Sequence, residues 1–153
     1  SHDTERILTT AKGDLQSVKS ALAFLYLQRG TPCIYYGTEL ALIGGPDPDC
    51  RRVMPWERVS GDNDMLNFMK GLNQLRKEVA SMIQYGKVSL EEVELDVVEV
   101  EWQYEGQILK AYFNQSKKDL VLESGQTDLM SLGSISDDRL IIQPNGFVIY
   151  RED

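Results

Sequence analysis

The spacing of hydrophobic residues divides the chain into a first half with helical periodicity and a second half with strand periodicity. Up to about residue 80, apolar residues recur every three or four positions in two long stretches. From about Ser81, apolar and polar residues alternate in short runs rich in β-branched and aromatic residues. This change of period predicts a domain boundary near residues 80–85, and we divide the chain into residues 1–82 and residues 83–153.

Two helices are predicted in the first half. One spans residues 14–29, because Asp14 is suited to cap its N-terminus and Gly30 follows at the usual stopping position. Its apolar residues cover more than one face, so we expect it to be buried on more than one side. The other helix spans about residues 64–79, with Asn63 as its cap.

Two strands and a long loop complete the first half. Residues 32–36 form a short apolar run between Thr-Pro and Gly, which is typical of a fully buried strand. The stretch up to Asp3 is expected to end another strand, so that strand, helix and strand form a parallel α/β unit. Glycines and prolines interrupt residues 37–62, and a loop of this length inside a domain is usually functional or disordered.

The second half is predicted to be a small antiparallel β-sandwich. Its alternating runs include one that continues over residues 93–104, and we expect Trp102 and Tyr104 in that run to be core residues and not a sugar platform. Turn residues separate the runs at Glu105-Gly106, Asn114 to Lys118, Ser124-Gly125 and Pro144-Asn145-Gly146.

Composition narrows the possible partners. The formal net charge is −8, which disfavours binding to nucleic acid or to anionic membranes. No apolar run is long enough to span a bilayer. Cys33 and Cys50 form neither a disulfide framework nor a metal-ligand pattern, so we expect two reduced thiols and a cytoplasmic location. We also expect neither a metal nor a cofactor.

Three stretches carry a resemblance to a known family. They read "SHDTERIL", "GTPCIYYGTE" and "GGPDPDCRRVMPWE". In this order and spacing they resemble the C-terminal third of the α-amylase family of glycoside hydrolases, closest to the cyclomaltodextrinase, neopullulanase and maltogenic amylase group. The resemblance implies an α/β plus all-β chain: residues 1–82 would be the seventh and eighth βα units of a (β/α)₈ TIM barrel. Residues 83–153 would be the β-sandwich C-terminal domain.

The resemblance also implies an activity and four site residues. Family members are retaining hydrolases of α-glucosidic bonds in maltodextrins, starch, pullulan or cyclomaltodextrins. The residue matching Asp3 is the transition-state stabiliser, and the residue matching His2 donates to the same sugar. The residues matching Asp47 and Arg51 hold a neighbouring sugar. Barrel enzymes place such groups where strands end and loops begin, which agrees with these positions.

Each site residue has a simpler interpretation. His2 and Asp3 could be terminal residues outside any site, and Asp47 with Arg51 could be a plain ion pair within the loop. We expect Arg52 to support the loop or face solvent, and Trp56 to be a packing residue that closes the loop.

Retaining glycosidases need two carboxylates, one as nucleophile and one as general acid and base. No stretch of the chain resembles either family motif. We therefore expect a C-terminal fragment that is inactive alone, whose partner in the whole enzyme is an α-glucan. The apolar surface of the first half favours self-association. The alternative is a non-catalytic carbohydrate-binding or accessory module.

Overall fold

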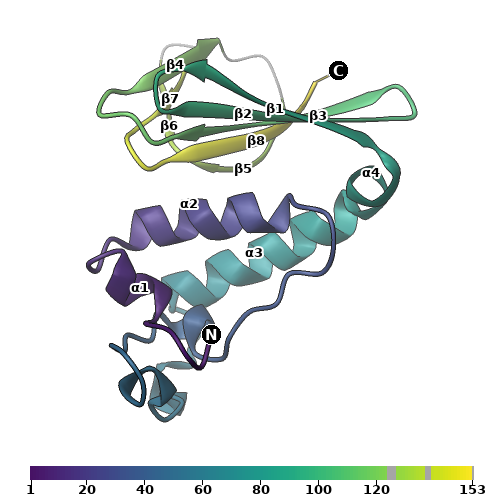
Figure 1. Ribbon diagram of the computed structural model, residues 1–153. Coiled ribbons are helices and arrows are strands. Elements are labelled where there is room, and N and C mark those ends of the chain that lie inside the picture. The colour runs from purple at the N-terminus through teal and green to yellow at the C-terminus, as the bar shows by residue number, and fades with distance from the viewer. Residues whose placement is uncertain (124–126, 137–138, 153) are drawn as a thin grey trace. The chain divides into compact units, whose positions relative to one another are not determined.

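The computed structural model describes residues 1–123, 127–136 and 139–152, which form two compact units (Figure 1). The first unit contains Ser1–Tyr26 and Thr31–Gln74. The second unit contains Leu27–Gly30 and Leu75–Asp153. All the strands of the described residues belong to the second unit, and the first of them begins at Lys87.

Helices and single helical turns make up the regular structure of the chain before the strands. In chain order they are α1 (Ile7–Thr10), α2 (Leu15–Tyr26), η1 (Thr38–Leu40), η2 (Asp49–Arg51), η3 (Trp56–Arg58), α3 (Asp64–Glu78) and α4 (Ala80–Tyr85). Among the described residues no helix combines the length and the apolar character needed to cross a bilayer.

Both predicted helix caps are confirmed. The Asp14 carboxylate accepts hydrogen bonds from the backbone amides of Gln16 and Ser17 at 3.0 and 3.1 Å, and α2 follows it. The Asn63 side chain accepts from the amide of Leu66 at 2.9 Å, and α3 follows. These side-chain oxygens satisfy amides that have no partner within a helix.

The first long helix ends earlier than its periodicity predicts, at Tyr26 instead of residue 29. The carbonyl of Leu27 accepts a hydrogen bond from the Trp102 indole at 3.1 Å. The Arg76 guanidinium takes the carbonyls of Gln28 and Gly30 at 2.8 and 2.5 Å. These tertiary hydrogen bonds replace the helical ones that would continue α2.

The two strands expected in the first half are not formed. Residues 31–35 have no regular structure, and the residues up to Asp3 form a turn. A parallel strand needs a neighbouring strand to exchange backbone hydrogen bonds, and none lies beside these residues in the part of the chain that the structure describes. The long loop predicted from residue 37 is present. Residues 37–63 contain no regular structure except the single turns η1, η2 and η3.

Two antiparallel sheets form the second unit (Figure 1). The strands are β1 (Lys87–Glu94), β2 (Val97–Tyr104), β3 (Gln107–Asn114), β4 (Leu120–Glu123), β5 (Thr127–Leu132), β6 (Ser134–Ser136), β7 (Arg139–Ile142) and β8 (Phe147–Glu152). One sheet has the order β1-β2-β3-β8-β5 and the other β4-β7-β6. The turn predicted at Ser124-Gly125 lies outside the described residues.

The beginning of the second unit differs from the sequence pattern. The run over residues 93–104, predicted as one strand, contains the end of β1, a turn at Leu95 and Asp96, and β2. Asp96 has a φ of 61°, a left-handed conformation that aspartate tolerates better than most residues. Before β1, residues 80–85 form the short helix α4, which the change of period near Ser81 did not predict.

A hydrophobic cluster joins the two sheets. Its buried members come from β2, β4, β7 and β8: Val97, Leu120, Leu140, Ile142, Val148 and Tyr150. The opposite face of β2 carries Trp102, which is 1% exposed and confirms the expectation of a core residue. Tyr104 is only half-buried, so the same expectation is wrong for that residue.

Asn114 ties both sheets to the turns between their strands. Its side chain is fully buried, and its amide donates to the carbonyls of Lys118 and Ile142, both at 2.8 Å. Its side-chain oxygen accepts from the amide and the hydroxyl of Ser116 at 3.0 and 2.7 Å. A buried amide with all these partners satisfied stabilises one arrangement of β3, β4 and β7.

Replacement of Asn114 by Ala should lower the free energy of unfolding by about 2–3 kcal/mol, because the hydrogen bonds of its buried amide to the carbonyls of Lys118 and Ile142 are lost. Gln115→Ala, at the exposed neighbouring position, should change it by less than about 0.5 kcal/mol. Guanidinium unfolding followed by circular dichroism measures both. Equal stabilities of the two variants would contradict the role given to Asn114.

Candidate active site

The four residues expected at the site lie together in the first unit. The His2 ring nitrogen Nε2 is 3.1 Å from the carboxylate of Asp3, and both side chains are 65% exposed. Arg51, in η2, places its Nη2 atom 2.7 Å from the Asp47 carboxylate and 3.6 Å from that of Asp3. One guanidinium therefore lies between two carboxylates from segments more than 40 residues apart in the sequence.

Further contacts hold the N-terminal segment against η2. The Nε atom of Arg51 and the buried thiol of Cys50 both donate to the backbone carbonyl of His2 at 3.0 Å. The backbone of His2 is thus anchored while its ring stays open to solvent. The expectation that Cys50 is a free thiol agrees with its position, since it is buried and unpaired with the exposed Cys33.

A second ion pair shapes the loop beside this cluster. Arg52 binds the Asp49 carboxylate with two donors, each at 2.8 Å, and the Gly45 amide donates to the same carboxylate at 2.7 Å. The Arg52 and Gly45 hydrogen bonds hold the pKa of the Asp49 carboxyl below its usual value. The carbonyl of Arg52 accepts from the Tyr36 hydroxyl at 2.7 Å. Arg52 therefore supports the loop, as the sequence led us to expect.

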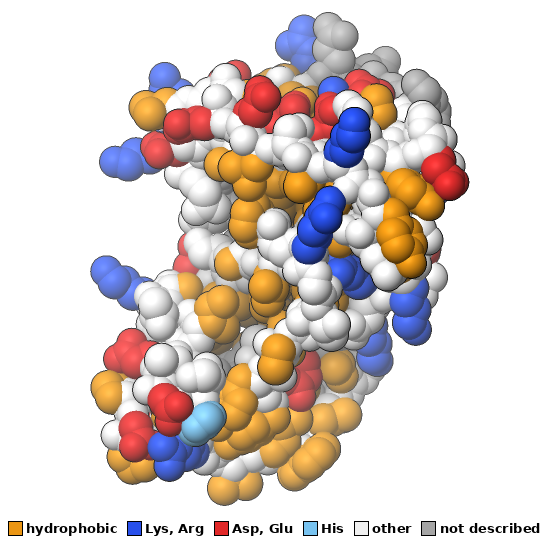
Figure 2. Space-filling model, turned by 45° about the vertical axis from the view of Figure 1, so that its right-hand side comes forward, with side chains coloured by type: hydrophobic (Ala, Val, Ile, Leu, Met, Phe, Trp, Pro, Cys, Tyr) orange, Lys and Arg blue, Asp and Glu red, His pale blue; other side chains and the backbone are white. Residues whose placement is uncertain are grey.

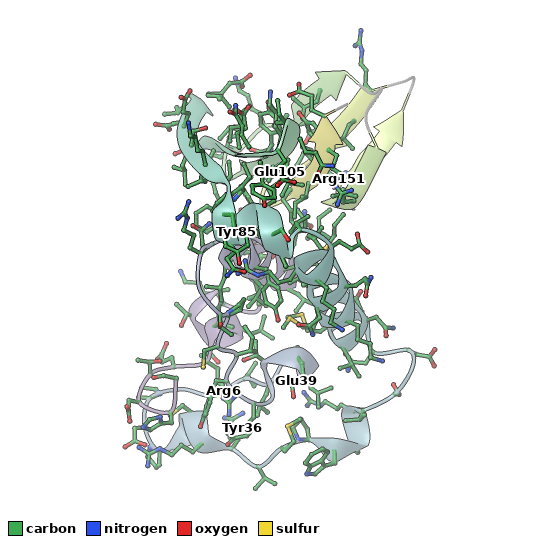
Figure 3. The ribbon with its side chains drawn as sticks, turned by 90° about the vertical axis from the view of Figure 1, so that its right-hand side faces the viewer. Arg6, Tyr36, Glu39, Tyr85, Glu105 and Arg151 are labelled. Atoms are coloured by element: carbon green, nitrogen blue, oxygen red, sulfur yellow. The ribbon has the colours of Figure 1, made fainter. Side chains whose placement is uncertain are left out.

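Beneath the exposed cluster lies the buried guanidinium of Arg6, which is 3% exposed. Its Nε atom donates to the Cys50 carbonyl at 2.7 Å, and its Nη1 atom donates to the Tyr36 carbonyl. It also lies over the rings of Tyr35 and Tyr36, 4.3 and 4.6 Å from their centroids. Figure 3 labels Arg6 beside Tyr36. The Nη2 atom of Arg6 is buried and has no hydrogen-bond partner among the described residues.

Two glycines let the loop approach Arg6 closely. Gly44 accepts the Arg6 backbone amide at 2.9 Å, and a Cβ atom at this position would lie 2.6 Å from the Asp49 carbonyl oxygen. Gly37 has a φ of 80°, and a Cβ atom there would lie 2.7 Å from the side chain of Leu42. Gly44 excludes larger residues because a side chain there would meet backbone atoms, and Gly37 favours glycine because its φ lies in the left-handed region.

A mostly apolar cavity of about 420 Å³ adjoins the cluster within the first unit. Arg6 and His2 line it together with apolar side chains such as Ile7, Leu22 and Leu25. Figure 2 shows hydrophobic side chains gathered on the face that carries the only histidine of the chain. Leu25 is 39% exposed, so part of this apolar surface is accessible to solvent.

The cluster is suited to bind hydroxyl groups. Ionised carboxylates accept hydrogen bonds, an imidazole donates or accepts them, and a planar guanidinium donates several at once. Among the described residues, no group of three or more His, Cys, Asp or Glu side chains could hold a metal ion. Trp56 is 71% exposed, so the expectation that it packs to close the loop is wrong.

Sequence reasoning missed Arg6. It lies only three residues after Asp3, but arginine is mostly exposed in proteins, and its partners are 30 and 44 residues further along the chain. The neighbouring pair Tyr35 and Tyr36 was a possible signal, because two adjacent aromatic rings after an apolar run provide a surface for a buried cation.

Comparison with known proteins places the chain in a family. The family model described as the alpha amylase catalytic domain matches residues 1–78, about half of the chain. An intracellular maltogenic amylase of Bacillus subtilis is 34% identical over an alignment that covers 97% of this chain and 27% of that protein. A cyclomaltodextrinase of Thermoanaerobacter pseudethanolicus is 34% identical and covers 99% of this chain and 27% of that protein.

Solved structures agree. The crystal structure of a maltogenic amylase from S. marinus superposes with a TM-score of 0.78 at 26% identity, over 99% of this chain and 21% of that one. The chain belongs to the alpha-amylase family of glycoside hydrolases. Nearly the whole chain matches these two curated relatives, but it spans only about a quarter of the length of each of them.

Replacement of Arg6 by Ala should lower the free energy of unfolding by about 3 kcal/mol, because two hydrogen bonds from a buried charged group are lost. Arg52→Ala is the matched control: this arginine is 44% exposed, and its removal should cost clearly less than the removal of Arg6. Chemical denaturation of both variants makes the comparison. A cost for Arg52→Ala as large as that for Arg6→Ala would refute the structural role of Arg6.

The Asp49 carboxyl should titrate below the usual aspartate pKa of about 3.9. Because the pKa is lowered in the folded loop, the stabilisation from this pair is complete above the usual pKa and is lost as the pH falls through the lowered one. Arg52→Gln should move the midpoint up, and Arg58→Gln, in η3, should leave it unchanged. Carboxyl-carbon NMR shifts follow the titration, and an unmoved midpoint in Arg52→Gln would contradict this cause.

Proposed function

We propose that the chain is the C-terminal part of a retaining α-glucan hydrolase of the maltogenic amylase, cyclomaltodextrinase and neopullulanase type. The observation that carries the proposal is the cluster of His2, Asp3, Asp47 and Arg51. These are the four residues that match the family's sugar-binding positions, and they meet around one guanidinium. The proposed substrates are α-glucans: maltodextrins, starch, pullulan or cyclomaltodextrins.

In the proposed enzyme, residues 1–82 complete a (β/α)₈ TIM barrel as its last two βα units, and residues 83–153 form the β-sandwich C-terminal domain. Two features of the first unit support the proposal that further barrel residues pack against it in the whole enzyme. The cavity beside Arg6 has apolar walls, and the Nη2 atom of Arg6 is a buried donor without a partner among the described residues. Upstream barrel residues would cover the walls and supply an acceptor.

Asp3 is the proposed transition-state stabiliser. Positive charge develops at the anomeric carbon as the glycosidic bond breaks, and hydrogen bonds from sugar hydroxyls to a fixed carboxylate strengthen as it does so. His2, 3.1 Å from Asp3, would donate to the same sugar. Asp47 would accept from hydroxyls of a neighbouring sugar, and Arg51 would orient both carboxylates.

The nucleophile and the general acid and base would come from the upstream part, so we propose that the chain alone is inactive. Self-association through the apolar surface of the first unit would cover the same face. The name of the Bacillus subtilis relative describes an intracellular protein, which supports a cytoplasmic location for this one.

A chimera tests the proposal. The segment of the Bacillus subtilis maltogenic amylase that matches this chain is replaced by residues 1–153. The chimera should hydrolyse maltodextrin or cyclomaltodextrin, and Asp3→Asn should lower its kcat about 100-fold or more, the size of one preorganised electrostatic contact. Asp62→Asn, an exposed aspartate elsewhere in the loop, is the matched control and should keep the parent rate.

Three results would contradict the proposal: a folded chimera without hydrolytic activity, an Asp3→Asn chimera with the parent kcat, or turnover of maltodextrin by the 153-residue chain on its own. The first would reject the assignment to an α-glucan hydrolase, the second the role of Asp3, and the third the division of catalytic groups.

A further inference from the structure

The second unit carries a hollow of its own, of about 440 Å³, where α4 meets the ends of β2 and β3. Tyr85, the last residue of α4, and Tyr104, the last residue of β2, border it. Their ring centroids are 6.2 Å apart and their planes are inclined by 34°. The volume is within the range of about 300–1,000 Å³ that is usual for small-molecule sites.

Tyr85 offers an open aromatic surface. The residue is 64% exposed, although it is a large side chain in contact with a second ring. Figure 3 labels Tyr85 together with Glu105, which lies in the turn that follows Tyr104. A rigid ring with a polar hydroxyl binds amphipathic ligands with little loss of conformational entropy.

Polar side chains surround these rings without an excess of charge. Lys87 on β1 and Gln103 on β2 are register partners, and Gln107 on β3 is the partner of Tyr104. With Glu105, they line the hollow and provide one cation, one anion and two amides. A hydrogen bond to Glu105 is the main reason why the pKa of the Tyr104 hydroxyl is raised, so these two groups also belong together.

This combination fits a neutral polyhydroxylated ligand. The apolar face of a sugar ring stacks on an exposed aromatic ring, and its hydroxyls need both donors and acceptors at the rim. Because Lys87 and Glu105 balance each other, the hollow does not select a phosphate or a carboxylate. The Gln103 amide already donates to Glu101 at 2.6 Å, so its side-chain oxygen is the group left to accept from a ligand hydroxyl.

We propose that the hollow between Tyr85 and Tyr104 is a second α-glucan-binding site, in which a glucose unit stacks on Tyr85. The choice of an α-glucan rests on the proposed function. The hollow belongs to the second unit and the cluster around Arg51 to the first, so the two sites share no residue. Binding at Tyr85 would retain a long glucan on the enzyme between cleavage events, which is a benefit of multivalent binding.

Titration of the 153-residue chain with maltoheptaose tests the site, by calorimetry and by amide chemical shifts. An Arg51→Ala background removes the guanidinium of the candidate active site and isolates the hollow. Saturable binding should shift the amides of Tyr85 and Gln103. Tyr85→Ala should weaken binding about tenfold or more, since a ring contact is lost. Tyr85→Phe should keep most of the affinity, because the stacking surface remains.

Leu95→Ala is the control for removal of an exposed apolar side chain, since Leu95 is 81% exposed in the β1–β2 turn and does not line the hollow. Its affinity should equal that of the parent. Circular dichroism checks that each variant is folded. Equal affinities of parent and Tyr85→Ala, or no binding of maltoheptaose in the Arg51→Ala background, would overturn the proposal.

The two proposals fail separately. An active chimera combined with unchanged affinity in Tyr85→Ala would reject the second site and leave the hydrolase assignment intact. An inactive chimera combined with tenfold weaker binding in Tyr85→Ala would reject the hydrolase assignment and support a glucan-binding module.

Discussion

The buried guanidinium of Arg6 is the interaction on which the candidate active site depends. Burial of a charge costs free energy, which here is offset by the carbonyls of Cys50 and Tyr36 and by two tyrosine rings. Tyr36 lies immediately before the long loop and Cys50 in its middle, whereas Arg6 follows Asp3 by three residues. One buried side chain therefore links the segment that follows Asp3 to the loop that carries Asp47 and Arg51.

The residues of the site differ in burial: those that hold the backbone are buried, and those that could contact a ligand are exposed. Arg6 and Cys50 are buried and bind backbone carbonyls, and the pair of Arg52 and Asp49 fastens the loop around them. Asp3 and His2 are 65% exposed above this frame. This arrangement agrees with the role proposed for Asp3, because a stabilising carboxylate has to be oriented and still accessible to a hydroxylated ligand.

Local features were predictable from the sequence. The helices that follow Asp14 and Asn63 form because their caps and periodicities are properties of neighbouring residues. The strand predicted over residues 32–36 is not formed, because a parallel strand exists only beside another strand, and its own sequence does not say whether that neighbour is present. The turn at Asp96 was missed because the alternation of apolar residues continues through it.

Some residues of the candidate site were predictable from the sequence and others were not. The short motifs gave His2, Asp3, Asp47 and Arg51, and the structure brings these four residues together. Arg6 was missed because its partners are distant in the sequence. The exposure of the aromatic residues could not be predicted from residue type. Trp56 and Tyr104 were both expected to be packing residues, but Trp56 is 71% exposed and Tyr104 lines a hollow.

The most direct test of the central claim is the crystal structure of the chimera with a sulfur-linked maltooligosaccharide, which resists hydrolysis. We predict that Asp3 and His2 contact the hydroxyls of one sugar ring and that Asp47 and Arg51 contact an adjacent ring. In that structure Arg6 should still hold the carbonyls of Cys50 and Tyr36. An oligosaccharide bound in the barrel without contact to Asp3 or Arg51 would contradict the account.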